Sequence, residues 1–299
     1  MRTFRKTSRW VSFLAVLTLA ASASASFQQN QPLSRKLRSI ARLYMAYGQY
    51  DKAEPYLLEA VQLSAGDSEK ENAICLIDLA TLYSYQDRLT ESEALFRRGL
   101  SAQQKALGPD HPYVAHTLRN LTAVYLRQHR LDQAIQTLEW AFDIILKHHT
   151  PDNRILVPFY IDQANLLTQL GCLEEAESIF TEILEKTSHQ FGQSHIYSAQ
   201  IHQGLAELYV QAELYERAAE HLAKGLEIQK SIYGKNHRML VDSYLLGAKI
   251  CRLQGNSQQM NNYFDLALSS IPSGDTAAVA RLYEKIEDIL SDKSIIAAL

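Results

Sequence analysis

A short pattern of small, apolar and tyrosine residues recurs along this chain at a fixed interval. It reads LATLY at 79–83, LTAVY at 121–125 and LAELY at 205–209. Tyr125 lies 42 residues after Tyr83, and Tyr209 lies a further 84 residues along, which is twice 42. Related copies complete the register, with QANLL at 163–167, GAKIC at 247–251 and, after a first interval of only 39 residues, IARLY at 40–44. Such a period predicts an array of one repeated unit, in which neighbouring units bury one another's apolar faces.

Further positions recur in the same register and predict the form of each unit. Three residues before the tyrosine position stands a small residue, in turn Ala41, Ala80, Thr122, Ala164, Ala206 and Ala248. Four residues after it stands a predicted turn residue, in turn Gly48, Asp87, His129, Gly171, Glu213 and Gly255. The leucines and tyrosines between these points follow helical spacing, and small residues let two helices approach closely. Each unit is therefore predicted to be a hairpin of two antiparallel helices.

The register of small, aliphatic, tyrosine, glycine and alanine residues is most complete in ARLYMAYGQYDKAEPYLLEA at 41–60. It resembles the tetratricopeptide repeat, and the period of 42 with Leu-Gly-x-x-His-Pro between units resembles the kinesin light chain variety. The resemblance implies an all-α, right-handed superhelical solenoid of six repeats over residues 33–270. Ser92, Ile183 and Met260 depart from the alanine that the pattern favours. After Pro272, Ser273 and Gly274, residues 275–299 are predicted to form a C-terminal capping helix that covers the last repeat.

The N-terminal segment has the layout of a secretory signal peptide. Basic residues precede an apolar run at about 10–20, and small alternating residues follow. We expect a signal peptide at 1–25, a flexible lead at 26–32, and export to the periplasm or the extracellular space. The alternative is that the segment is retained as a membrane anchor, although the run is shorter than the roughly 17 to 25 residues that span a bilayer.

Charge and motifs bear on the class of function. The formal net charge is −3, and the N-terminal segment contributes four basic residues and no acid, so the remainder carries −7. A negative charge of this size argues against a nucleic-acid partner. The sequence contains neither a Cys-x-x-Cys nor a His-Glu-x-x-His metal motif, and no Gly-x-Ser-x-Gly elbow. We therefore expect no enzyme, no metal and no cofactor; a hydrolase or metalloenzyme would require a histidine, a carboxylate and a nucleophile to converge.

The joints between units carry recurring polar residues. His111, His195 and His237 stand at equivalent joints, and Asp152 and Asn153 take that place at another. A residue type that recurs at joints is explained by the joint, where its side chain can accept hydrogen bonds from the first turn of the next helix. Gly108, Gly192 and Gly234 are predicted to end the preceding helices.

The three cysteines fall in separate units. Repeats in a solenoid touch mainly their neighbours, so Cys75, Cys172 and Cys251 are expected to be too far apart for a disulfide. Cys75 and Cys251 are predicted core residues, and Cys172 lies in a turn.

The resemblance places the binding surface on the concave face, which the first helix of each hairpin lines. The positions it implies in this sequence are Arg42, Tyr85, Arg119, Asn120, Arg127, Asn165, Gln169, Gln203 and Glu207, with Arg38 beside them. In this interpretation the arginines and amides hold an extended peptide or a partner helix through its backbone and acidic side chains, and Tyr85 adds an apolar contact. Other proteins or peptides are thus the expected partners. The alternative is that these side chains only form the solvated face of their helices.

Overall fold

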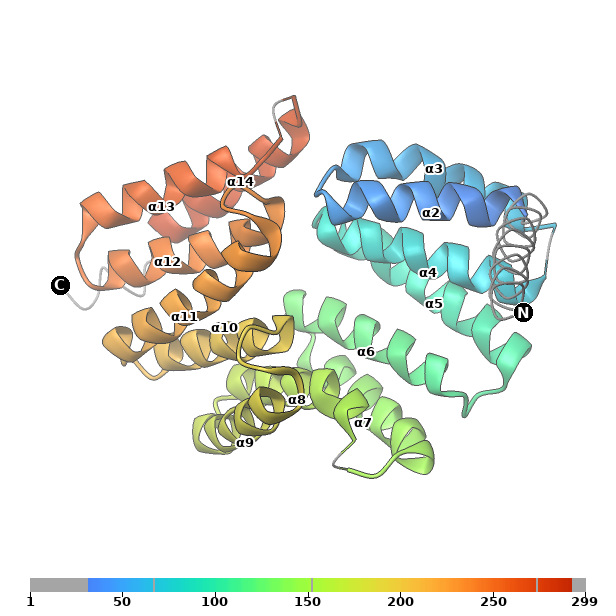
Figure 1. The fold of residues 1–299 in the computed structure, drawn as a ribbon, viewed down its shortest axis with the longest axis horizontal. Coiled ribbons are helices and arrows are strands. Elements are labelled where there is room, and N and C mark those ends of the chain that lie inside the picture. The colour runs from blue at the N-terminus through green and yellow to red at the C-terminus, as the bar shows by residue number, and fades with distance from the viewer. Residues whose placement is uncertain (1–31, 67, 152, 273, 292–299) are drawn as a thin grey trace, which may run out of the picture.

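A computed structural model describes residues 32–66, 68–151, 153–272 and 274–291 of this chain. The predicted signal peptide, residues 26–31 of the predicted lead and residues 292–299 of the predicted cap lie outside this part. The described part is all-α, and the solenoid predicted from the repeat is confirmed (Figure 1). Its α-helices are α2 (Leu33–Ala46), α3 (Tyr50–Ser64), α4 (Glu69–Tyr85), α5 (Leu89–Leu107), α6 (Pro112–Arg127), α7 (Leu131–His148), α8 (Val157–Gln169), α9 (Leu173–Phe191), α10 (Ile196–Gln211), α11 (Tyr215–Tyr233), α12 (Val241–Leu253), α13 (Ser257–Ser269) and α14 (Thr276–Ser291). Short 3-10 turns, η1 (Arg154–Leu156) and η2 (Arg238–Leu240), precede α8 and α12.

Successive helices pair as antiparallel hairpins, from α2 with α3 to α12 with α13, and α14 follows the last pair. Figure 1 shows the hairpins following one another around an open ring, with the blue N-terminal hairpin and the red C-terminal helices on either side of its opening. Among the described helices, none is both long and apolar enough to cross a membrane.

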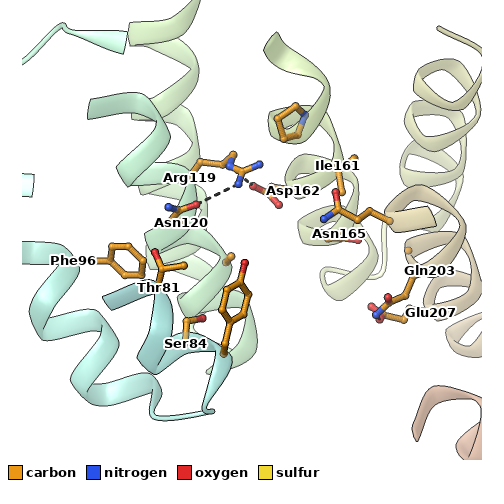
Figure 2. Close-up of a pocket in the computed structure, with 15 residues that line it drawn as sticks. Thr81, Ser84, Phe96, Arg119, Asn120, Ile161, Asp162, Asn165, Gln203 and Glu207 are labelled. Atoms are coloured by element: carbon orange, nitrogen blue, oxygen red, sulfur yellow. Dashed lines mark hydrogen bonds and ion pairs between the residues drawn. The ribbon is translucent and has the colours of Figure 1, made fainter. Parts of the chain in front are cut away.

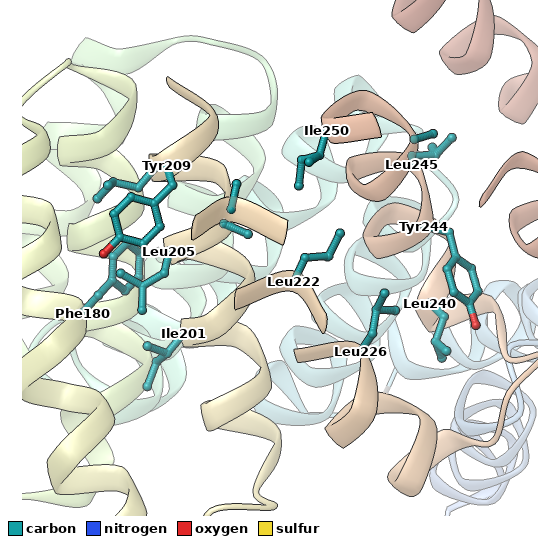
Figure 3. Packing of buried hydrophobic residues seen from close by; sticks show 14 of the residues in the cluster. Phe180, Ile201, Leu205, Tyr209, Leu222, Leu226, Leu240, Tyr244, Leu245 and Ile250 are labelled. Carbon is teal, nitrogen blue, oxygen red and sulfur yellow. The ribbon is translucent and has the colours of Figure 1, made fainter. Parts of the chain in front are cut away.

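Small residues hold each hairpin together at the positions that recur in the sequence. Ala41, Ala80, Thr122, Ala164, Ala206 and Ala248 have no exposed surface. Ser92, which departs from the favoured alanine, is also fully buried, and its hydroxyl donates a hydrogen bond to the Ala80 carbonyl at 2.7 Å. Between the hairpins, larger side chains interdigitate into a core that is continuous from α8 to α14 (Figure 3). Close approach within a unit and apolar packing between units are therefore both encoded in the repeat.

The turn inside each hairpin contains one residue in the left-handed region. The φ angles there are +68° at Gly48, +80° at Gly171 and +74° at Gly255, and non-glycine residues fill the other three turns, with +65° at Asp87, +55° at His129 and +59° at Glu213. The predicted turn position is confirmed in all six hairpins, including those where a side chain makes this conformation costly.

The joints between hairpins behave as predicted. The Nδ1 atoms of His111, His195 and His237 accept hydrogen bonds from backbone amides two residues on, at 3.1 to 3.2 Å. Asn153 does the same through Oδ1 at 3.0 Å. These side chains cap the next helical segment, so their recurrence has a structural cause.

The two ends of the array contact each other, which the sequence did not predict. Tyr50 at the start of α3 donates its hydroxyl to Met239 Sδ at 3.2 Å, and the Arg238 guanidinium lies 4.5 Å from the centre of the Tyr50 ring. His237 Nε2 lies 3.1 Å from the Ala46 carbonyl oxygen, and Arg238 forms an ion pair with Asp275. The first hairpin thus touches η2, far along the chain, and we call this set of contacts the end contact. It adds a contact between distant units to the expectation that units touch mainly their neighbours.

Candidate functional site

The concave face of the ring contains three adjoining hollows. The central hollow has a volume of about 330 Å³, the end hollow about 320 Å³ and the side hollow about 430 Å³. Ser84, Tyr85 and Ala123 line both the central and the end hollow, Glu207 lines the central and side hollows, and Lys285 lines the end and side hollows. We call the three together the inner cavity.

Most residues that the sequence placed in the groove line the inner cavity. The central hollow (Figure 2) is lined by Tyr85 from α4, Arg119 and Asn120 from α6, Asn165 from α8, and Gln203 and Glu207 from α10. Arg127 lines the end hollow and Gln169 the side hollow. The first helices of successive hairpins therefore supply these side chains, as the resemblance implied.

Arg42 and Arg38 lie outside the inner cavity. Arg42 forms an ion pair with Asp78 on α4 at 2.8 Å. Arg38 is buried between α2 and α4, where it binds Asp78 at 2.7 Å and Glu71 at 2.8 Å. These two arginines join the first two hairpins, because carboxylates on the next helix lie within reach of them.

Arg127 is also engaged within the chain. Its guanidinium donates to Asp87 at 2.6 Å and to the Ser84 carbonyl at 2.7 Å, so it fixes the end of α6 against the α4–α5 turn. Asp87 in turn pairs with Lys285 of α14 at 3.0 Å. The interpretation of Arg127 as a free partner for acidic side chains is therefore corrected, because its guanidinium is already paired with Asp87.

An incompletely bonded ion pair forms part of the central hollow. Arg119 Nε lies 3.7 Å from Asp162 Oδ2, and both atoms are buried without a hydrogen bond to any described residue. Another nitrogen of Arg119, Nη2, donates to Asn120 Oδ1 at 3.2 Å (Figure 2). Burial raises the pKa of Asp162 to about 6, although the neighbouring Arg119 opposes the shift. The pair offers a donor and an acceptor at one point of the cavity.

Asp162 was missed from the sequence, although a signal for it existed. Asp162 stands two residues before the small residue of its repeat, Ala164. Asn120 has the equivalent position in the preceding repeat, two residues before Thr122. The resemblance implied Asn120 as a groove position, and the same register extended to α8 would have identified Asp162. Lys285 could not have been found in this way, because α14 is not part of the repeat.

Other polar groups of the central hollow have unused hydrogen-bonding capacity. The amides of Asn165 and Gln200 and the hydroxyl of Tyr85 make no side-chain hydrogen bond within the described part of the chain. By contrast, Gln203 is held by Glu207 at 3.2 Å and by Ser243 at 3.1 Å. The Tyr85 ring stacks on Tyr50 at 5.5 Å between centroids, so it is positioned while 45% of the residue stays exposed.

Comparison with known proteins identifies the repeat. The family model described as tetratricopeptide repeat matches residues 33–104, 73–147 and 159–231, more than half of the chain. The chain belongs to the tetratricopeptide repeat family. Such repeats generally mediate contacts between proteins.

Several known tetratricopeptide relatives are similar over much of this chain. Tetratricopeptide repeat protein 19 homolog, mitochondrial, of Drosophila melanogaster is 24% identical over 74% of the chain. KINESIN LIGHT CHAIN-RELATED 3 of Arabidopsis thaliana is 23% identical over 87% of it. The chain spans only 63% and 40% of the length of these two relatives. Among solved structures, NprR in complex with its cognate peptide NprX has a TM-score of 0.66 at 14% identity, covering 96% of this chain and 82% of NprR.

Within the part of the tetratricopeptide array that the structure describes, no group of three or more histidine, cysteine, aspartate or glutamate side chains could hold a metal ion. All three cysteines are free, with Cys75 and Cys251 buried and Cys172 exposed. The chemistry that the central hollow offers is hydrogen bonding by amides, hydroxyls, the Glu207 carboxylate and one ion pair, next to the exposed ring of Tyr85.

Proposed function

We propose that this tetratricopeptide repeat protein is a non-enzymatic scaffold that binds an extended segment of a partner protein in its inner cavity. The observation that carries the proposal is that the Asn165 amide lines the central hollow and makes no side-chain hydrogen bond with a described residue, beside the exposed ring of Tyr85. An extended backbone presents N–H and C=O groups at regular intervals, and an asparagine amide can accept from one and donate to the other. The peptide bound by NprR, which shares this fold, is consistent with such a ligand.

The arrangement also suggests how the segment would be oriented. Asn165 and Gln200 provide neutral partners for its backbone, whereas the exposed ring of Tyr85 provides an apolar contact. The partly neutralised Arg119 and Asp162 pair favours a polar side chain over a strongly charged one, because each ion already faces the other. A protein or peptide fits this lining better than a nucleic acid, for which a strongly basic surface is typical.

The proposal is tested with peptides selected from a random library against residues 26–299. We expect Asn165→Ala combined with Tyr85→Ala to weaken binding of a fluorescein-labelled selected peptide at least about tenfold, since a hydrogen bond and an aromatic contact are lost. Fluorescence anisotropy measures the dissociation constant. Asn262→Ala, which makes the same chemical change at an exposed position on α13, is the control and should have no effect. Selected peptides that bind the double variant as tightly as the original protein would contradict the cavity as the site.

We further propose that the protein is exported and that residues 1–25 are removed. The support is the layout of the N-terminal segment, with basic residues, an apolar run and then small residues. Mass spectrometry of the protein from its native host should find an N-terminus close to residue 26. An intact N-terminus on a membrane-bound protein would instead support the retained anchor.

A further inference from the structure

The end contact also forms part of the wall of the inner cavity. Tyr50, Arg238 and Met239, which join the first hairpin to η2, all line the end hollow. The ion pair between Asp87 and Lys285 joins the α4–α5 turn to α14 and lines the same hollow. We call the end contact and this ion pair together the seam. It lies between the N-terminal hairpins and the C-terminal helices, which face each other across the opening of the ring in Figure 1.

The contacts that hold the seam are few, and each is weak. The Tyr50 hydroxyl donates to a thioether sulfur, which is a weak acceptor. The side chains of Lys285 and Asp87 are 34% and 28% exposed, so water screens their attraction. Asp51 of α3 also interacts across the seam with Asp275, which precedes α14. Burial, together with this second carboxyl group, raises the pKa of Asp51, so its ionised form is disfavoured when the seam is closed.

No apolar cluster of the described residues crosses the seam. Tyr50 packs with Leu57 and Leu82 in a cluster of the first hairpins, whereas Leu240 and Leu282 belong to the core that runs from α8 to α14. Burial of apolar surface is the main favourable term in packing one hairpin against the next. Parting the seam therefore exposes little apolar surface and leaves the hairpins on both sides intact. Small movements at successive junctions, added along the array, are sufficient to separate the two ends.

We propose that the seam is a gate, which opens to admit an internal segment of a partner chain sideways into the inner cavity. The inference rests on the function proposed above, the binding of an extended segment there. The three hollows have volumes of about 320 to 430 Å³, far less than a folded domain occupies. A segment with a folded domain on each side therefore cannot be threaded into the closed ring end first, whereas a segment with a free end can.

A disulfide across the seam tests the gate. A Cβ on Gly48 would lie 3.0 Å from Arg238 Cβ, near the separation of about 3.5 to 4.5 Å that a disulfide needs. Gly48 has a φ of +68°, but non-glycine residues hold the same turn position in three other hairpins, so cysteine is acceptable there. The lock variant of residues 26–299 carries Gly48→Cys and Arg238→Cys, with Cys172→Ser to remove the exposed native thiol. Its oxidised and reduced forms differ only in the new bond.

The probe is the fluorescein-labelled peptide selected for the cavity, either free or placed between two immunoglobulin domains. Stopped-flow anisotropy measures the association rate constants. The oxidised and reduced forms should bind the free peptide equally, and the oxidised form should bind the doubly flanked peptide at least about tenfold more slowly, because the lateral route is closed. A peptide with one attached domain retains a free end. It controls for the size of the probe and should bind both forms alike.

Each other outcome overturns the gate. Equal association of the doubly flanked peptide with both forms excludes it and leaves the function proposed for the cavity intact. Loss of the free peptide from the oxidised form also excludes it, because the seam would then determine the shape of the cavity and not the route into it. A variant that forms no disulfide under mild oxidation contradicts the closed seam itself. Failure of the unchanged protein to bind any selected peptide is a failure of the proposed function, and the gate falls with it.

Discussion

Replacement of Gly204 by alanine is expected to lower the free energy of unfolding by about 1 to 3 kcal/mol. A Cβ at this position of α10 would lie 2.7 Å from Phe180 Cε1 and 2.9 Å from Asn165 Oδ1. Phe180 has no exposed surface and lies in the core that Figure 3 shows, so it has no free space to move into. Alanine by itself would favour the helix by about 1 kcal/mol over glycine, so a net loss would show that the close approach of α9 and α10 dominates.

Gly247→Ala is the matched control for this prediction. Its Cβ would lie 2.7 Å from the Tyr263 ring, a comparable overlap. Tyr263 is only partly buried on the outer helix α13, and its ring can swing aside, so we expect a change within about 1 kcal/mol of zero. Urea denaturation followed by circular dichroism measures both variants. A Gly204→Ala protein as stable as the original would contradict the tight packing of α10 against α9.

Replacement of Arg38 by methionine is expected to destabilise the protein by about 3 kcal/mol. Arg38 binds both Glu71 and Asp78, and Arg38 and Glu71 are 7% and 6% exposed. Methionine retains much of the side-chain volume but removes the charge, so two carboxylates between the first two hairpins lose their shared partner. The remaining contacts, Arg35 with Glu71 at 3.5 Å and Arg42 with Asp78 at 2.8 Å, involve exposed arginines and compensate only in part.

Arg42→Met provides the comparison for Arg38→Met. Arg42 is more than half exposed and makes a single ion pair, so its loss should cost less than about 1 kcal/mol. Thermal denaturation at neutral pH distinguishes the two variants. Equal effects would mean that the burial of Arg38 adds nothing to the stability of the junction.

The parts of the fold that the sequence predicts are those that each repeat needs locally. A hairpin turn needs one residue with positive φ, and the register of Gly48 identifies all six of these positions even where Asp87, His129 or Glu213 stands in place of glycine. The capping histidines could be predicted for the same reason, because each accepts a hydrogen bond from one backbone amide of the helical segment that directly follows it. Repetition makes such signals visible, since chance would not place them at the same offset several times.

The candidate site was predicted less completely, because its details depend on contacts between units. Six of the residues that the concave register gave line the central hollow: Tyr85, Arg119, Asn120, Asn165, Gln203 and Glu207. The register could not show that Arg127 is bound by Asp87, or that Arg38 is buried and bound by Asp78. Each of these carboxylates lies on another hairpin, and a repeat pattern describes positions within one unit, not side-chain contacts between two units. The end hollow could not be predicted from the sequence for a further reason. Each hairpin is rotated slightly relative to the one before, and these rotations accumulate until η2 and α14 lie beside α3 and α4 and enclose the hollow.

The contact of Tyr50 and Ala46 with residues 237–239 changes how unfolding can start. A linear array normally frays from its termini, since a terminal unit has a neighbour on one side only and little is lost when it opens. Here the first hairpin has a second neighbour far along the chain, so opening it also breaks contacts to η2, and opening η2 weakens the first hairpin. A one-dimensional cooperative model of this array would therefore need an interaction between its first and last units. Local opening at one end of the array is then coupled to the stability of the units at the other end.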